Sequence, residues 1–167
     1  MDTDFLFRWA TAGDHNLLAD IMFDAVRNGE SCYSQLQRAA WVPSRRSGPE
    51  WEARLENQEI LLAERDGKGV GFVSLADGGY IDFAYIRPDA QRTGLFRQLL
   101  TPIVDRAVAK GEPLLWTHAS LMAEPAFERL GFAVRRREQV VLGEVNLERC
   151  EMEKRLTSPD EAEKIAS

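Results

Sequence analysis

Hydrophobic positions follow two different periods in the first part of the chain. Residues 4–10 alternate approximately, with the polar side chains of Asp4 and Arg8 among apolar ones, and this pattern predicts a half-buried β-strand. Residues 17–25 instead place apolar side chains three and four positions apart, as on one face of a helix. Asp14 can cap the start of this helix, and the pair Asn28-Gly29 can end it. The chain therefore begins with a predicted strand and a predicted amphipathic helix.

The next segment contains a short helix and then three predicted strands. A helix is expected over residues 33–41, and Pro49 can begin a further helical turn. Segments 59–66, 70–76 and 80–86 are rich in β-branched and aromatic residues, which predicts strands. The turns between these strands carry hairpin signals, Asp66-Gly67-Lys68-Gly69 and Asp77-Gly78-Gly79. The three strands are therefore expected to form a meander.

The helical period returns at Gly94 and continues to Lys110, although Pro102 predicts a kink or a rearranged turn inside this helix. After the helix we expect a strand, another helix and a final antiparallel pair of strands. Their residues are 113–118, 121–130, 132–142 and 145–156. The predicted order is β-α-α-β-β-β-α-β-α-β-β. This order is typical of an α/β (α+β) domain with a mixed, mostly antiparallel sheet flanked by helices, and not of a doubly wound parallel sheet.

Length and composition agree with a single globular domain. The 167 residues are 44% hydrophobic and 29% charged, close to the averages of globular proteins. A chain of this length forms about one domain, which we place at residues 1–156, followed by a polar C-terminal tail at 157–167. The apolar runs are too short to cross a membrane, and the acidic start lacks the basic region of a signal peptide. We therefore expect a soluble cytoplasmic protein that has no membrane partner.

The charge pattern narrows the class of ligand. A net charge of −6 argues against a nucleic-acid-binding protein that is held by a broad basic face. Residues 86–112 are locally basic, with five basic against three acidic side chains. This suits a small anionic ligand, and a solvated helix face is the alternative. Cys32 and Cys150 are too few for a disulfide framework or a zinc site, so no metal site is expected.

The segment 86–100, IRPDAQRTGLFRQLL, joins a predicted strand to a predicted helix through a loop that begins with a proline. The N-terminus of a helix presents free N–H groups and favours an anion. Gly94 lets the backbone approach a phosphate without an intervening Cβ atom, and Arg92 and Arg97 lie beside it. An anion site and a plain strand–loop–helix connection are both compatible with these residues.

The same segment resembles the signature of the GNAT superfamily of acyl-CoA-dependent N-acyltransferases. That signature has an aliphatic residue, a proline two positions later, Gln/Arg-x-x-Gly-x-Gly/Ala, and a helix with paired leucines. The residues at the corresponding positions here are Ile86, Pro88, Gln91, Gly94, Phe96, Leu99 and Leu100, with Arg92 and Thr93 between Gln91 and Gly94. A second family motif, a helix that ends in aromatic-x-x-x-Gly-Phe, matches residues 127–132. Both motifs occur in order on the predicted strand order. The opening segment FLFRWATAGD also resembles the family's first strand and helix entry, and the closing EMEKRL resembles its last strand, so the resemblance covers roughly residues 3–156.

The resemblance implies an acetyltransferase that uses acetyl-CoA as its acyl donor. Backbone amides at the start of the helix would hold the CoA pyrophosphate, and the pantetheine arm would lie along the strand edge at Tyr85 and Ile86. The residues implied for the pyrophosphate are Gln91, Arg92, Thr93, Gly94, Leu95 and Phe96. A primary amine of a small molecule or a peptide would attack the thioester directly while a base removes its proton. Homodimers are common in the family, and no dimer motif is visible here.

Two positions depart from the family pattern. Phe96 occupies the position of a small residue in the signature, and Phe127 occupies the position at which many members carry a tyrosine that protonates the leaving thiolate. Phe127 cannot donate a proton, so its expected contribution is to the CoA-binding region. The departures leave two alternatives open. One is a non-catalytic acyl-CoA-binding or sensing module on the same fold, and the other is an interaction module that no longer binds CoA.

The candidates for the catalytic base lie near the predicted CoA loop. Asp82 is the leading candidate because Ile81 and Phe83 flank it and would bury it in part. The alternative is that Asp82 accepts a structural hydrogen bond from a backbone amide. Tyr80 lies two positions away and would share the same face of the strand. His118 ends a predicted strand, where sites often lie, although a histidine there is often only a hydrogen-bonding residue.

Overall fold

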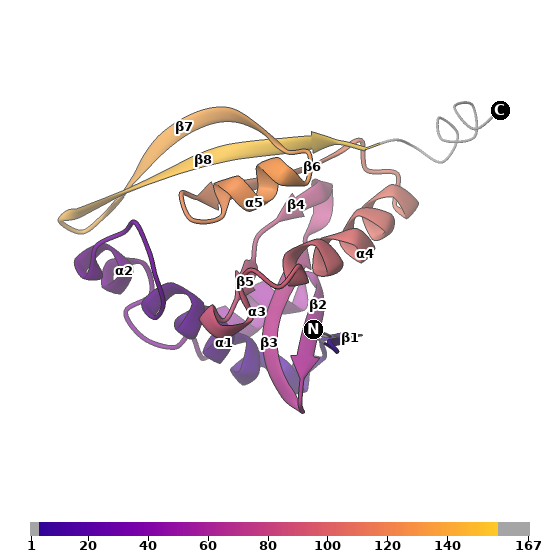
Figure 1. Ribbon diagram of the computed structural model, residues 1–167, viewed down its shortest axis with the longest axis horizontal. Helices are drawn as coiled ribbons and strands as arrows, with labels where there is room; N and C mark the ends of the chain where they lie inside the picture. Colours follow the sequence, from indigo (N-terminus) through magenta and orange to yellow (C-terminus); the bar gives the residue numbers. More distant parts are fainter. Residues whose placement is uncertain (1–3, 157–167) are drawn as a thin grey trace.

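A computed structural model describes residues 4–156 of the chain (Figure 1), and the predicted tail at 157–167 lies outside the described residues. The strands are β1 (Leu6–Trp9), β2 (Glu59–Arg65), β3 (Lys68–Leu75), β4 (Tyr80–Ile81), β5 (Ala84–Ile86), β6 (Leu114–Ser120), β7 (Ala133–Leu142) and β8 (Val145–Arg155). The α-helices are α1 (His15–Arg27), α2 (Gln35–Trp41), α3 (Pro49–Glu56), α4 (Leu95–Ala109) and α5 (Glu124–Arg129). The predicted class, a mixed sheet arrangement flanked by helices, is confirmed.

The strands form two sheets of four strands each. Their orders are β1-β2-β3-β5 and β4-β6-β8-β7. Neighbouring strands are antiparallel except for β4 and β6, which are parallel. In Figure 1 the long β7–β8 hairpin crosses the upper part of the molecule, and β2 and β3 lie below it. The two sheets are joined through the short segment that contains β4 and β5.

The prediction of a single strand over residues 80–86 is wrong. Asp82 and Phe83 interrupt it, and β4 and β5 belong to different sheets. Thr117 Oγ1 donates a hydrogen bond of 2.8 Å to the carbonyl of Ile81, which holds the end of β4 against β6. One residue after Asp82, Ser74 N–H donates to the Phe83 carbonyl at 2.9 Å, which ties the start of β5 to β3. The chain therefore leaves one sheet and enters the other within two residues.

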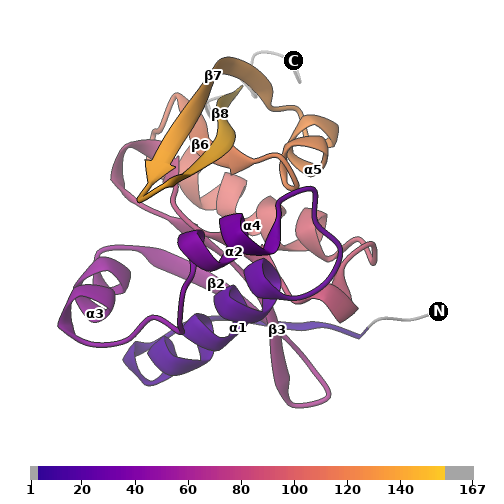
Figure 2. The same ribbon diagram turned by 90° about the vertical axis from the view of Figure 1, so that its left-hand side faces the viewer.

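Helices cover both faces of the β1-β2-β3-β5 sheet. Figures 1 and 2 show α1 and α3 on one side of β2 and β3, with α4 on the opposite side. Two apolar cores result because each helix buries its apolar face against the sheet. Buried residues of the core beneath α4 and α5 include Leu99, Ile103, Leu115 and Met152. Those of the core beneath α1 and α3 include Leu18, Ile21, Trp51 and Phe72.

Three elements differ in detail from the sequence-based expectation. β1 is less buried than predicted, with Leu6 73% exposed, because it is an edge strand that pairs only with β2. The expected turn at Pro49 is the eight-residue helix α3. Helix α4 continues from Leu95 to Ala109 through Pro102 as one element.

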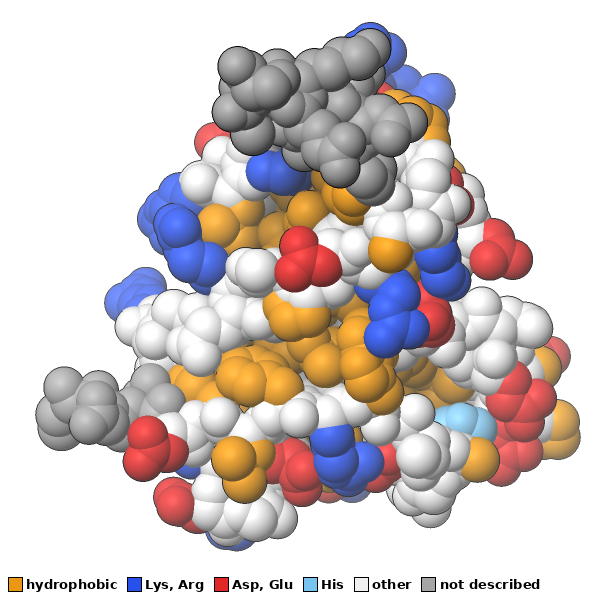
Figure 3. Space-filling model, turned by 90° about the vertical axis from the view of Figure 1, so that its right-hand side faces the viewer, with side chains coloured by type: hydrophobic (Ala, Val, Ile, Leu, Met, Phe, Trp, Pro, Cys, Tyr) orange, Lys and Arg blue, Asp and Glu red, His pale blue; other side chains and the backbone are white. Residues whose placement is uncertain are grey.

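The surface mixes charged and apolar side chains. On the face drawn in Figure 3, hydrophobic side chains form a band across the middle that is bordered by basic and acidic ones. Of the helices within residues 4–156, none has both the length and the apolar character needed to cross a membrane.

Candidate active site

The loop before α4 turns the chain sharply at two residues. Arg92 has φ of 60° and Gly94 has φ of 83°, so both adopt the left-handed conformation. The hydroxyl of Thr93, between them, donates a hydrogen bond of 2.6 Å to the carbonyl of Ala90. A Cβ atom added at Gly94 would meet no other atom within 4 Å. The glycine therefore serves the backbone conformation and leaves open space in front of the helix.

Six consecutive backbone N–H groups are free at this loop. Among residues 4–156, no N–H group from Arg92 to Arg97 donates a hydrogen bond, and the first helical bond runs from Gln98 N–H to the Gly94 carbonyl at 3.3 Å. The run starts at Arg92 because the preceding N–H, of Gln91, already donates to the Pro88 carbonyl. Free N–H groups at the start of a helix, together with its dipole, form a binding site for an anion.

The side chains around these amides are exposed or directed into the core. The side chain of Arg92 is 89% exposed, 3.6 Å from the Glu30 carboxylate, and Arg97 is also exposed. Leu95 is buried in the core. The ring of Phe96 packs against the same core, so its bulk is directed into the protein. Phe127 is 1% exposed and belongs to that core.

The edge of β5 that faces away from β3 provides further free backbone groups. Arg87 N–H donates to the Val70 carbonyl, and the Phe83 carbonyl accepts from Ser74 N–H. Since only alternate residues of an antiparallel strand bond to a given neighbour, Ala84 and Ile86 direct their backbone groups to the other side. The Ile86 carbonyl there accepts a hydrogen bond of 3.0 Å from Gln91 Nε2. An extended ligand can therefore bind along this edge, beside the loop of free amides.

Tyr85 lies on the same strand with its side chain among aromatic rings. Its ring centroid is 6.2 Å from that of Trp41 and 5.9 Å from that of Phe72. Burial raises the pKa of the Tyr85 phenol, so the side chain stays neutral. Its contribution to the site is therefore an apolar wall, and the strand edge at this point is formed by its two neighbours.

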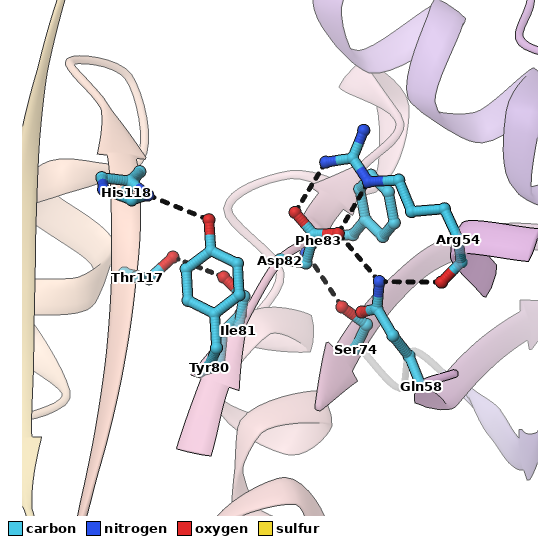
Figure 4. Close-up of polar contacts among 9 residues, drawn as sticks. All are labelled: Arg54, Gln58, Ser74, Tyr80, Ile81, Asp82, Phe83, Thr117 and His118. Carbon is cyan, nitrogen blue, oxygen red and sulfur yellow. Dashed lines mark hydrogen bonds and ion pairs between the residues drawn. The ribbon is translucent and has the colours of Figure 1, made fainter. Parts of the chain in front are cut away.

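Tyr80 and His118 form a hydrogen-bonded pair where β4 ends. Tyr80 Oη lies 2.9 Å from His118 Nδ1, and Figure 4 shows the phenol pointing at the imidazole. The ring of Trp116 packs on Tyr80 with a centroid distance of 4.3 Å. Burial raises the pKa of Tyr80 and lowers the pKa of His118. The pair is thus a neutral phenol next to a neutral imidazole, which is an arrangement that can transfer a proton.

Asp82 is engaged by two residues of the α3 region. Arg54 donates two hydrogen bonds to its carboxylate, from Nε at 2.8 Å and from a terminal nitrogen at 2.7 Å. Gln58 Nε2 donates a third at 2.8 Å. Figure 4 shows Asp82 directed toward Arg54 and Tyr80 directed toward His118. The sequence-based expectation that Asp82 and Tyr80 act on one face of a continuous strand fails, because β4 ends at Ile81.

Arg54 and Gln58 were missed in the sequence because nothing local marks them. Arg54 is one of several arginines in the segment between α2 and β2, and its partner Asp82 is 28 residues away. Arg54 also stacks over the Phe83 ring, with its guanidinium carbon 4.5 Å from the ring centroid. The ion pair of Arg54 with Asp82 and the stacking of Arg54 on Phe83 join residues that are far apart in the sequence, so only the folded chain brings them together.

Comparison with known proteins shows the family of the chain. The sequence profile of the family described as acetyltransferase (GNAT) domain matches residues 29–156. The chain is 32% identical over 129 residues to "Uncharacterized N-acetyltransferase YafP" of Escherichia coli strain K12, which covers 77% of this chain and 81% of that protein.

Solved structures share the fold over nearly the whole chain. The GCN5-related N-acetyltransferase from Rhodopseudomonas palustris superposes with a TM-score of 0.85 at 27% identity and covers 93% of this chain and 99% of its own. The structure of yncA from Salmonella typhimurium, with its cofactor acetyl-CoA, superposes with a TM-score of 0.64 at 23% identity and covers 92% of this chain and 94% of its own. As both sequence motifs predict, this chain belongs to the GNAT acetyltransferase family.

Proposed function

We propose that this protein transfers the acetyl group of acetyl-CoA to a primary amine of a small molecule or a peptide. The observation that carries the proposal is the run of free N–H groups from Arg92 to Arg97 at the start of α4. A diphosphate carries the charge and the acceptor oxygens that such a run binds. Membership of the acetyltransferase family and the acetyl-CoA bound to yncA support the same donor.

The two parts of CoA match two parts of the proposed site. The pyrophosphate binds to the amides of residues 92–97, and Arg92 and Arg97 add positive charge nearby. The pantetheine arm carries amide groups, which pair with the backbone groups of Ala84 and the N–H group of Ile86 in the way that an added strand pairs with a sheet. Because the edge leads from the loop toward the break at Asp82, the thioester end of the arm approaches the Tyr80–His118 pair.

The transfer step follows from these positions. The nitrogen of a neutral amine attacks the thioester carbonyl carbon, so that a C–N bond forms and the C–S bond breaks. The proton of the attacking nitrogen passes to the Tyr80–His118 pair, and the departing thiolate takes a proton from solvent. The Asp82 carboxylate already accepts three hydrogen bonds. We therefore assign Asp82, together with Arg54 and Gln58, to the part of the site that holds the acceptor amine (the acceptor side), and not to proton removal.

A binding measurement followed by a turnover assay tests the proposal. A ligand at 100 times its dissociation constant stabilises a protein by about 2.7 kcal/mol, which raises the melting temperature of a chain of this size by several degrees. We expect such a shift with CoA and with acetyl-CoA. Thiol release from acetyl-CoA is then measured across a panel of primary amines. Absence of a thermal shift at millimolar ligand would contradict the CoA site, and binding without thiol release would favour a non-catalytic acyl-CoA-binding module.

A further inference from the structure

His118 belongs to a row of polar side chains that crosses four neighbouring strands. Tyr80 comes from β4, His118 from β6, Arg149 from β8 and Glu138 from β7, in a sheet of order β4-β6-β8-β7. Tyr80 Oη is 2.9 Å from Nδ1 of His118, and the other ring nitrogen, Nε2, is 3.7 Å from Oε1 of Glu138. Arg149 Nε donates a hydrogen bond of 2.8 Å to the same carboxylate oxygen. The two nitrogens of the imidazole thus face two different oxygens, a phenol and a carboxylate.

Glu138 is ionised in this arrangement. The hydrogen bond from Arg149 is the main cause that lowers the pKa of the Glu138 carboxyl below its ordinary value. A carboxylate can only accept a proton or a hydrogen bond, whereas a phenol can both donate and accept. The negative charge on Glu138 therefore favours a proton on the nitrogen that faces it, Nε2, and leaves the lone pair of Nδ1 for the hydroxyl of Tyr80.

The charged groups around His118 act on its pKa in opposite directions. On β7, Arg136 lowers the pKa of the imidazole and Glu138 raises it. On β8, Arg149 lowers this pKa and Glu151 raises it. Tyr80 from β4 and Trp116 from its own strand are the uncharged neighbours. Burial is the main cause that lowers the pKa of His118. The imidazole is consequently neutral and carries a single proton. The nitrogen without this proton is the one that can accept a second proton.

We propose that Glu138 is a positioning residue that fixes the proton of His118 on Nε2, so that Nδ1 receives the proton that the attacking amine releases through Tyr80. The inference rests on the proposed function. As the C–N bond forms, Tyr80 Oη accepts the proton of the amine nitrogen and passes its own proton to Nδ1. The product is an imidazolium with a proton on each nitrogen, one of them facing the Glu138 carboxylate. Glu138 stabilises this cation and does not itself take up a proton, as in other carboxylate–histidine pairs.

Nitrogen NMR tests the tautomer directly because the chain has only two histidines, His15 and His118. Protein labelled with ¹⁵N-histidine is examined by long-range ¹H–¹⁵N correlation above the pKa of the imidazole. We expect His118 to carry its proton on Nε2 and to lose this preference in Glu138→Gln, whereas the His15 signals do not change. A proton on Nδ1 of His118 in the unsubstituted protein would overturn the inference. This readout requires no turnover, so it is independent of whether the proposed function holds.

Kinetics provide the second test, with a matched control on the same hairpin. Glu153 pairs with Arg135, and its side chain is 23% exposed, the same as that of Glu138. We expect Glu138→Gln to lower kcat about tenfold with little change in the KM of the amine, whereas Glu153→Gln leaves both unchanged. Without the carboxylate the imidazolium is less stable, so the acidic limb of the kcat/KM profile should move to lower pH by about 0.5–1 unit.

The outcomes separate the two proposals. Equal kcat values and the same acidic limb in Glu138→Gln and the unsubstituted enzyme would overturn the role of Glu138 while acetyl transfer stands. Absence of thiol release from the unsubstituted protein would instead contradict the proposed function, and the NMR result would still decide where the His118 proton lies.

Discussion

Phe96 packs edge-on against Phe127, with ring centroids 4.9 Å apart and an angle of 81° between the rings. Phe127 in turn packs on Phe132 at the same centroid distance. The two phenylalanines that depart from the GNAT pattern therefore contact each other inside the core. A bulky residue in the loop signature is accommodated here because its ring packs into the core, on the second departing residue.

We predict that Phe96→Ala lowers the stability of the protein but has little effect on CoA binding. The free energy of unfolding should fall by about 1–3 kcal/mol, less than the 3–5 kcal/mol that is typical of a fully buried phenylalanine, because Phe96 is only half-buried. The Kd of CoA should change less than about threefold, since residue 96 contributes its N–H group to the site. Urea unfolding and isothermal titration calorimetry measure the two quantities. A large loss of CoA affinity in a folded variant would show that the ring itself contacts the cofactor.

Gly94→Glu should abolish CoA binding and leave the protein folded. A side chain at φ of 83° costs about 1–2 kcal/mol of strain, but the Cβ atom enters open space, so the fold can accommodate it. The carboxylate would repel the pyrophosphate, and we expect affinity to fall by at least about a hundredfold. Gly94→Ala carries the same strain without the charge, and Gly67→Glu places the same charge in the β2–β3 turn. Similar CoA affinity in Gly94→Glu and in these two controls would refute the amide site.

Substitutions of His118 and Asp82 should affect different kinetic constants. His118→Asn removes the proton acceptor, so we expect kcat to fall at least about a hundredfold with little change in KM. Asp82→Asn loosens Arg54 and Gln58 on the acceptor side, so the KM of the amine should rise and kcat should fall less than about tenfold. Initial rates over a range of amine concentrations separate the two effects. If Asp82→Asn lost more kcat than His118→Asn, Asp82 would be the base.

The loop before α4 and its free N–H groups could be predicted from the sequence because the features that form them are local. A proline, a glycine at a helix start and the surrounding periodicity determine where free N–H groups occur, and all of this is encoded within residues 86–100. The same is true of α1, which begins directly after Asp14 and ends at Arg27, before the cap at Asn28. Backbone sites of this kind need no distant partner.

The contacts of Asp82 and His118 could not be predicted in the same way because they depend on distant partners. Residues 80–86 are predicted to form one strand because they are rich in aromatic and β-branched side chains. The strand breaks at Asp82 because the carbonyl of Ile81 is hydrogen-bonded to β6, whereas the carbonyl of Phe83 is hydrogen-bonded to β3. The contacts of Asp82 with Arg54, and of His118 with Glu138, likewise join residues from separate elements. Pattern and spacing identify such residues as polar but not as partners.

The ion pair between Arg8 and Asp14 predicts a pH-dependent contribution to stability. Two hydrogen bonds of 2.8 Å from Arg8 are the main cause that lowers the pKa of Asp14 to about 2. A depressed carboxyl pKa stabilises the folded state above the unfolded pKa, near 4, and this stability is lost as the pH falls toward 2. Because Arg8 is 42% exposed, solvent screening limits the contribution to about 1 kcal/mol.

Urea unfolding of Asp14→Asn across pH 2–7 checks this prediction. The unsubstituted protein should be more stable than the variant by a nearly constant amount above about pH 5, and most of the difference should be lost by the time the pH reaches about 2. Asp20→Asn, which changes a more exposed carboxylate on α1, is the control. A stability difference for Asp14→Asn that did not depend on pH would mean that packing, and not ionisation, explains the loss.

Tyr33 connects the segment before α2 to the end of β6 and to β8. Its hydroxyl accepts a hydrogen bond of 2.8 Å from Leu121 N–H and donates one of 2.6 Å to the Glu148 carbonyl. Tyr33 is 7% exposed, so Tyr33→Phe leaves two backbone groups without their partner in a place where water has little access. We expect the free energy of unfolding to fall by about 1–3 kcal/mol.

Amide hydrogen exchange distinguishes this loss from a general loosening of the fold. In Tyr33→Phe the Leu121 N–H should exchange faster because its acceptor was the phenol oxygen. Ala123 N–H, two residues later, donates to the Ser120 carbonyl at 3.1 Å and should keep its protection. If both amides lost protection equally, the hydroxyl would hold the whole connection after β6 in place, and the segment between α1 and α2 would depend on it for its position over the site.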